Sequence, residues 1–125
     1  MILVVGIPSE TPIQMVRDRL DDAGVPYITL NQRVFARCRI AFEVRHGVVT
    51  GSLTLPGGTF RLEDVRAIYT RMMDDRNLPE LRGEPPDSVL RKHCRGFHEA
   101  LTRWMEITPA HVINRCAPMG SRWKN

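Results

Sequence analysis

The sequence has no long hydrophobic run, no glycine-rich motif and no close-set group of cysteines. No stretch approaches the roughly 18 apolar residues that a membrane-spanning helix requires, and no basic segment precedes the apolar residues 2–6. We therefore expect neither a membrane segment nor a signal peptide. The three cysteines, Cys38, Cys94 and Cys116, are odd in number and far apart, unlike the framework of a secreted disulfide protein. These absences predict a reduced, cytoplasmic protein.

The composition is that of one ordinary soluble domain. The chain has 125 residues, with 42% apolar and 26% charged residues. A domain of this size buries about two-thirds of the surface of its unfolded chain, so it needs no metal or disulfide to fold. The formal net charge of +4 comes mostly from sixteen arginines. This modest surplus permits phosphate, carboxylate or nucleic-acid partners without requiring them.

Hydrophobic patterns predict an α/β fold. Residues 2–6 form a short apolar run that is typical of a parallel strand buried on both faces, and residues 27–31 form a second strand. Between them, Thr11 as the N-cap and Pro12 as the first helical residue begin a helix that ends near Gly24. The order strand, helix, strand predicts a parallel pair joined by a right-handed crossover.

Strict alternation of apolar and polar residues follows. Residues 40–46 and 48–55 alternate around a tight turn at His46–Gly47, and residues 59–62 add a third strand, so we expect a half-exposed antiparallel β-meander. The remaining predicted elements are two strands over residues 66–71 and 111–114, a polar surface loop over residues 74–87, and a long amphipathic helix over residues 88–107. The predicted fold class is α/β, with three layers around a mostly parallel central sheet.

Arginine and asparagine residues follow the predicted strands. The strand ends carry Asn31 and Arg33, then Arg71, and finally Asn114 and Arg115. Ligands of open parallel sheets bind at the edge formed by the carboxyl ends of the strands. We therefore expect a cationic rim that binds phosphate or carboxylate groups. The alternative is that these are ordinary surface arginines in an arginine-rich chain.

Other candidate motifs are incomplete. The turn over residues 6–11 has one glycine and two prolines, and the second strand ends in Asn31 rather than in an acid that would hold a ribose. Cys94 and His98 lie four residues apart on the long helix, but no second ligand cluster accompanies them. We expect no catalytic residue, no metal site and no cofactor site within this chain.

A second basic cluster is formed by Arg33, Arg37, Arg39 and Arg45. A nucleic-acid interface usually interleaves such residues with aromatic side chains. Phe35 is the one aromatic residue among them. A solvated basic face is therefore the favoured interpretation, and we do not expect nucleic acid as the partner.

Four segments, in this order, resemble a known family. They are ILVVG, QMVRDRLDDAGVPYITLN, GSLTLPGGTFRLEDVRAIYTRM and EALTRWMEITPAHVINRCAPMG. Their order and spacing are similar to the N-terminal, Rossmann-like pre-ATP-grasp domain of the ATP-grasp ligases that mature ribosomal peptides (the microviridin-type ester- and amide-forming enzymes). They resemble more distantly the enzyme that adds glutamate to a ribosomal protein. The family's strand-end arginine matches Arg71, and its Asn-Arg pair after the last strand matches Asn114 and Arg115. This sequence departs from the family in one place: where the family's fifth strand ends in an aromatic residue and an arginine, it has Tyr69-Thr70-Arg71-Met72-Met73.

The resemblance implies a division of the chain and a role. Residues 1–114 would form the pre-ATP-grasp domain, and residues 115–125 would form a linker toward an ATP-grasp domain. That later part would hold ATP and magnesium, so this fragment alone would be inactive. Arg71, Arg115, Asn114 and Arg33 would bind substrate.

The resemblance also implies a reaction and partners. The full enzyme would make an acyl-phosphate from a carboxylate and ATP, which an amine or hydroxyl then attacks. The expected partners are the ATP-grasp domain of the same chain and a peptide or protein substrate. Apolar surface left by a missing neighbour would also favour a homodimer. The alternative function is a stand-alone basic binding or regulatory module for nucleic acid or an acidic partner.

Overall fold

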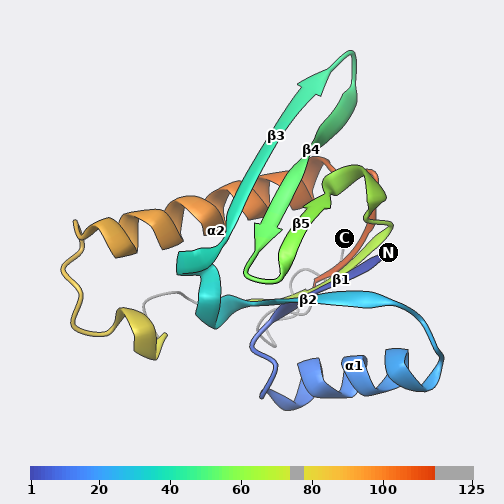
Figure 1. The fold of residues 1–125 in the computed structure, drawn as a ribbon, viewed down its shortest axis with the longest axis horizontal. Coiled ribbons are helices and arrows are strands. Elements are labelled where there is room, and N and C mark those ends of the chain that lie inside the picture. Colours follow the sequence, from blue (N-terminus) through green and yellow to red (C-terminus); the bar gives the residue numbers. More distant parts are fainter. Residues whose placement is uncertain (74–77, 115–125) are drawn as a thin grey trace.

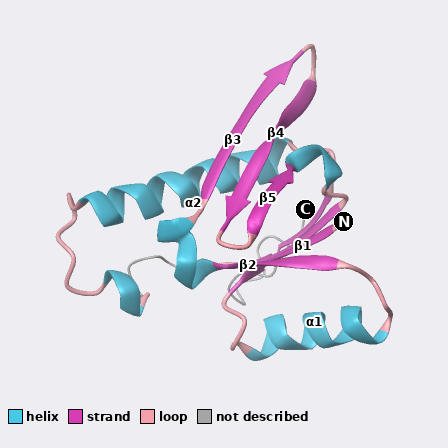
Figure 2. Ribbon diagram, viewed as in Figure 1, coloured by secondary structure: helices cyan, strands magenta, loops and turns pink. Residues whose placement is uncertain are grey.

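The computed structural model describes residues 1–73 and 78–114 of the chain (Figures 1 and 2). Its elements form two sheets and two α-helices, with short 3₁₀-helices between them. In chain order they are β1 (Ile2–Gly6), α1 (Thr11–Asp22), β2 (Tyr27–Asn31), η1 (Gln32–Arg37), β3 (Arg39–Arg45), β4 (Val48–Leu55), β5 (Gly58–Arg61), η2 (Leu62–Asp64), β6 (Ala67–Arg71), η4 (Pro79–Leu81), α2 (Val89–Ile107) and β7 (His111–Asn114). The predicted α/β class is confirmed.

Sheet A is the parallel centre of the fold. Its strand order is β2–β1–β6–β7, and every neighbouring pair is parallel. Successive side chains of β1 point to opposite faces, yet Leu3, Val4 and Val5 are all at most 1% exposed. The continuous apolar run is thus explained by cover on both faces of the sheet.

Helix α1 covers one face of sheet A (Figure 1). It begins one residue earlier than the sequence predicts, because the carbonyl of Glu10, not that of Thr11, accepts the first helical hydrogen bond, from the Gln14 N–H at 2.9 Å. Proline is tolerated in the first turn, where the N–H has no helical partner. At the other end Gly24, with φ of 69°, supports two closing bonds, from its own N–H to the Asp21 carbonyl and from Val25 to Leu20. These two bonds make a Schellman motif.

Sheet B is the predicted meander, and it is a separate antiparallel sheet of order β3–β4–β5. The β3–β4 turn consists of His46 and Gly47, whose φ angles are 52° and 78°. Two successive positive φ angles are what a type I′ hairpin turn requires. Farther along the hairpin, a Cβ on Gly51 would clash with the carbonyl oxygen of Ala41, so glycine lets the two strands approach closely.

Helix α2 covers the other face of sheet A together with sheet B (Figure 1). Ser88 is its N-cap, and the Ser88 hydroxyl accepts the Arg91 N–H at 3.0 Å. Its apolar stripe is confirmed by four buried residues in the main core: Cys94, Phe97, Leu101 and Trp104. In the described part of the chain, no helix is long and apolar enough to cross a membrane.

The polar segment before α2 differs from the expected surface loop. Residues 74–77 lie outside the described residues, but Leu78 and Leu81 are 2% and 1% exposed and belong to the main core. The Arg91 side chain fixes this segment by donating to the carbonyl oxygens of Glu84 and Leu81 at 2.9 and 2.7 Å. Two leucines thus anchor to the core a segment whose other described residues are mostly exposed.

Candidate functional site

The candidate site is the edge of sheet A where the strands end. The register pairs Gly6 of β1 with Asn31 of β2 and with Arg71 of β6, and it pairs Thr70 with Asn114 of β7. Since all four strands are parallel, these carboxyl ends lie along one edge, as the sequence predicts. We call this the strand-end edge. In open α/β sheets such an edge is where ligands bind.

Gly6 allows the ends of β1 and β6 and the first turn of α1 to pack closely at the centre of the strand-end edge. A Cβ on this residue would lie 2.8 Å from the carbonyl oxygen of Arg71 and 2.7 Å from Cδ1 of Ile13. Side-chain carbons do not approach backbone oxygens that closely, so only glycine fits. The ends of β1 and β6 and the first turn of α1 are therefore held together, which gives Arg71 a rigid base.

Arg71 lies at the centre of the strand-end edge. Its side chain is 37% exposed, and its Nε is 3.9 Å from Oε1 of Glu10, whose side chain is 33% exposed. Ion pairs at this length and exposure contribute little to stability. Glu10 lies in the turn after β1, so the pair places the guanidinium over that turn. Sequence reasoning did not single out Glu10, because nothing local links it to a strand 61 positions later.

Gln32 holds the segment that follows β6. It is fully buried, its Nε2 donates to the Met73 carbonyl at 2.7 Å, and its Oε1 accepts the Met73 N–H at 3.0 Å. The amide thereby replaces a backbone partner and closes two hydrogen bonds at once. It joins the end of β2 to the end of β6, so it positions the chain that leaves Arg71.

Arg33 occupies a different position from Arg71. Its Nε donates to Oε2 of Glu80 at 2.7 Å, and its backbone N–H donates to Oδ1 of Asn31 at 2.9 Å. The ion pair joins η1 to η4, and the Asn31 side chain caps η1. Both residues are thus near the strand-end edge with structural partners of their own, and their contact with a substrate stays a prediction.

The last predicted site residues lie at the limit of the described chain. Asn114 ends β7 opposite Thr70. Arg115 and the predicted linker, residues 115–125, lie outside the described residues. The role predicted for Asn114 therefore rests on its place at the end of β7, and the role predicted for Arg115 rests on its following Asn114 in the sequence.

The histidine and cysteine residues of α2 lie within or beside the core. The carbonyl oxygen of Cys38 is 2.9 Å from Nε2 of His93, Cys94 is 4% exposed, and the ring of His98 meets Phe35 edge-on at 6.2 Å. Among residues 1–73 and 78–114, no three histidine, cysteine or acidic side chains gather into a metal site.

Cys38 lies where the chain passes from η1 into sheet B. Its thiol is fully buried and donates to the Val34 carbonyl at 3.2 Å. Burial disfavours the charged thiolate and raises the pKa of Cys38 to about 11, against the opposing attraction of Arg37. The thiol is therefore protonated at neutral pH, which does not suit a nucleophile.

The fold is similar to that of one part of three solved enzymes. The first is a RiPP-associated ATP-grasp ligase of Chryseobacterium gregarium, solved with ADP and a leader and core peptide. It has 18% identity and a TM-score of 0.65 over 98% of this chain and 36% of the ligase.

The other two are macrocyclases of Microcystis aeruginosa MRC. MdnC, solved with the precursor peptide MdnA, has 14% identity and a TM-score of 0.59 over 91% of this chain and 37% of its own. MdnB has 19% identity and a TM-score of 0.61 over 89% of this chain and 36% of its own. No family model and no curated protein matches the sequence. The chain thus spans about a third of these enzymes' length and shares the fold of that third.

Proposed function

We propose that this chain is the N-terminal, substrate-facing domain of an ATP-dependent ligase that modifies a ribosomally made peptide. The proposal rests on the strand-end edge, in a domain whose fold is similar to one part of the three enzymes. This edge brings together Gly6, Asn31, Arg71 and the end of β7. The three similar enzymes include two solved with peptides, which supports a peptide as the substrate.

Arg71 is the residue to which we assign the binding of an anionic substrate group. Its base is fixed by the close approach at Gly6 and by the Gln32–Met73 bonds. Its pair with Glu10 at 3.9 Å is long and partly exposed, so a carboxylate entering the cleft competes with Glu10 at small cost. In the proposal, Arg33 and Arg115 complete the cationic rim, and Asn114 adds a neutral amide that contacts the substrate. In this role the domain forms one wall of the substrate cleft.

ATP and magnesium belong, in this proposal, to the remainder of the ligase. The turn after β1 is a poor phosphate cradle, because Pro8 and Pro12 lack the N–H groups that would bind phosphate oxygens. No acidic cluster in the described part of the chain suits magnesium. The bound nucleotide supplies the phosphoryl group that activates a carboxylate, and an amine or hydroxyl of the peptide displaces phosphate. This chain's contribution is to hold and orient the peptide.

The test uses the product of the whole gene, read beyond the codon for Asn125. We expect it to form ADP when Mg-ATP is supplied with a peptide substrate. Replacing Arg71 with Ala should lower kcat/KM for the peptide by about tenfold or more, which corresponds to one lost charge-assisted hydrogen bond. Arg45→Ala, on the hairpin, is the matched control and should leave kcat/KM unchanged. Unchanged kinetics in the Arg71 variant, or no peptide-dependent ADP, would refute the proposal.

A further inference from the structure

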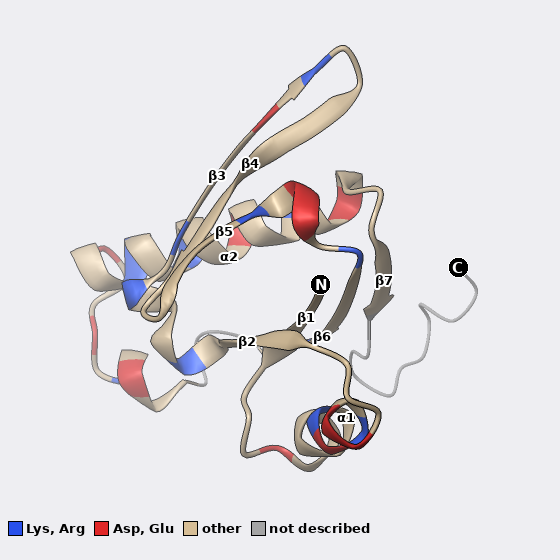
Figure 3. Cartoon of the chain, turned by 45° about the vertical axis from the view of Figure 1, so that its right-hand side comes forward, with Lys and Arg blue, Asp and Glu red and all other residues tan. Residues whose placement is uncertain are grey.

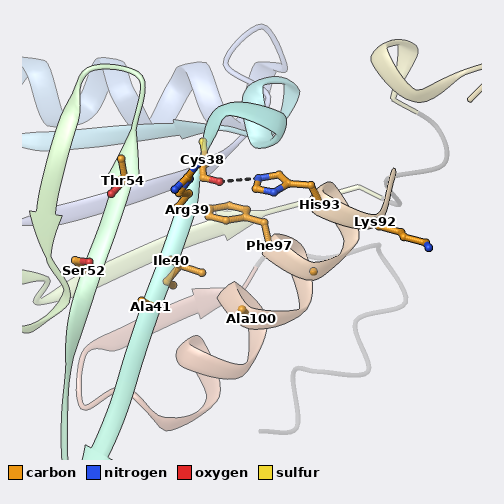
Figure 4. A pocket seen from close by; sticks show the side chains of 11 residues that line it. Cys38, Arg39, Ile40, Ala41, Ser52, Thr54, Lys92, His93, Phe97 and Ala100 are labelled. Carbon is orange, nitrogen blue, oxygen red and sulfur yellow. Dashed lines mark hydrogen bonds between the residues drawn. The ribbon is translucent and has the colours of Figure 1, made fainter. Parts of the chain in front are cut away.

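A groove lies between sheet B and α2, outside the strand-end edge. It has a volume of about 500 Å³. In Figure 4, Ile40 of β3 lies across from Phe97 and Ala100 of α2. Ser52 and Thr54 also line the groove, from β4 on the other side of β3. Apolar walls with a few hydroxyl groups are typical of a binding groove.

The charged residues along the groove are basic. Arg39 at the start of β3 and Lys92 of α2 line it, and no acidic residue is among the described residues that do so. Figure 4 shows the Lys92 side chain extending away from the strands, so Arg39 is the main cation of the groove. Figure 3 shows basic residues in η1, at the start of β3 and in the first half of α2 on one side of the molecule. This charge favours an anionic occupant.

Gly96 leaves the groove open from the helix side. It lies in the interior of α2, where glycine is less favourable than any residue except proline. Apart from its chain neighbours and the nearby backbone of α2, no atom of the described residues lies within 4 Å of where its Cβ would be, so internal packing does not require glycine at this position. A helical glycine facing open space permits the backbone of a ligand to approach closely.

The strand beside the groove has a free edge. Among the described residues, β3 pairs with β4 alone and is therefore an edge strand of sheet B. Four consecutive residues, 38–41, line the groove, although successive side chains of a strand point to opposite faces. The groove thus runs along the strand itself, where an extended peptide can add through backbone hydrogen bonds.

We propose that this groove binds an acidic, extended segment of the peptide substrate, with a carboxylate of that segment held by Arg39. The identity of the occupant as substrate rests on the proposed function. The groove is connected to the strand-end edge through η1, which joins Asn31 at the end of β2 to Cys38 at the start of the groove. A peptide held here has a neighbouring segment available for the strand-end edge.

The test measures binding of a fluorescein-labelled peptide of alternating Glu and Thr residues to the 125-residue chain, by anisotropy at low ionic strength. The control peptide alternates Gln and Thr. We expect the acidic peptide to bind about tenfold more tightly or better. Equal binding of both peptides, or no binding of the acidic one, would overturn the proposal.

Paired variants locate the binding. Gly96→Met fills the groove and should weaken binding by about tenfold or more, whereas Gly96→Ala should change it little. Both should melt at or above the temperature of the parent chain, because each replaces a helical glycine. Arg39→Gln should weaken binding, while Arg45→Gln, six positions along the same face of β3 and paired with Glu43 at 3.4 Å, should not.

Three further outcomes would count against the groove. Binding that is indifferent to Gly96→Met, or reduced equally by Arg39→Gln and Arg45→Gln, would place the peptide elsewhere. Tighter binding of a single-stranded oligonucleotide, lost in Gly96→Met, would assign the groove to nucleic acid instead. The assay needs neither ATP nor ligase activity, so its failure is distinguishable from failure of the proposed function.

Discussion

Sheet A and sheet B are buried in different ways. In sheet A, β1 is covered by α1 on one face and by α2 with sheet B on the other, so Leu3, Val4 and Val5 are all buried. In sheet B, β3 alternates between exposed residues such as Arg39 and half-buried residues such as Ile40. The buried strand β1 therefore offers a ligand only its end, whereas β3 also offers a face and an edge.

This difference assigns the two sheets separate roles. At the strand-end edge, side chains are fixed by contacts that cross the sequence, such as the bonds from Gln32 to Met73. Along the groove, the polar groups come from an exposed strand face and from a helix that leaves open space at Gly96. We infer that sheet A holds the side chains of the proposed site in fixed positions. Sheet B, in contrast, provides an exposed surface that can adapt to a bound peptide.

The largest expected effect is in the interior of sheet A. Ile68 of β6 is fully buried, so Ile68→Ala should destabilise the chain by about 2–5 kcal/mol through lost burial and a cavity. Val44 of sheet B is 52% exposed, so Val44→Ala should change stability by no more than about 0.5 kcal/mol. Urea denaturation measures both. Similar losses for the two variants would contradict the contrast in burial.

Gln32 gives the next effect, at the boundary of the proposed site. Gln32→Leu removes both partners of Met73, and each buried group left unpaired costs about 1–3 kcal/mol. Urea denaturation measures the loss, and faster hydrogen exchange of the Met73 amide localises it. Gln14→Leu, at an exposed position of α1, is the control. Slow exchange at Met73 in the Gln32 variant would show that another group holds this segment.

Cys38 provides a pH-dependent effect at the junction of the two sheets. Its pKa rises from 9.0 to about 11 on folding, so the protonated thiol favours the folded state. This contribution is complete below pH 9.0, where the unfolded thiol is also protonated, and is lost as pH rises through about 11. The two-unit shift corresponds to about 2–3 kcal/mol.

The measurement is the free energy of unfolding between neutral pH and pH about 11, compared with Cys38→Ala. The variant lacks the titrating thiol, so its stability should fall less steeply over this range. Parallel pH curves for the two chains would show that the thiol does not contribute. Slow alkylation of Cys38 at neutral pH is the companion expectation.

Glu63 gives the smallest effect and concerns sheet B alone. Its carboxylate accepts the Gly51 N–H at 3.0 Å, and this bond, with help from Arg61, lowers the pKa of Glu63 below its ordinary 4.5. The resulting stabilisation is present above pH 4.5 and is lost as pH falls through the lowered pKa. Glu63→Gln should therefore show a slightly smaller fall in melting temperature on acidification than the parent chain. An identical fall in both would contradict this contribution.

Local signals explain how much of the fold was predictable. Some signals act within a few residues: the apolar run of β1, the His46–Gly47 turn and the Ser88 cap. The strands, the meander and α2 therefore follow from the sequence, with boundaries shifted by about one residue. The parallel order of β1 and β2 follows from the crossover rule. These elements place Asn31, Arg71 and Asn114 on one edge without knowledge of the structure.

The features that sequence reasoning missed depend on contacts between distant residues. Gln32 is a polar residue after a strand, and only its partner 41 positions away shows that it is a buried clamp. Leu78 and Leu81 lie in a segment rich in proline and charge, and only the fold shows that they reach the core. The groove requires β3 to lie beside α2, a packing that no local pattern predicts.

Thermal melting with Mg-ATP, on this chain and on the product of the whole gene, tests the central claim most directly. A ligand that binds only the folded state raises the melting temperature by mass action. We predict stabilisation of the long product and none of the 125-residue chain, because the proposed function assigns the nucleotide site to the remainder of the ligase. Stabilisation of this chain by Mg-ATP would place a nucleotide site within it, and stabilisation of neither would remove the basis for an ATP-dependent ligase.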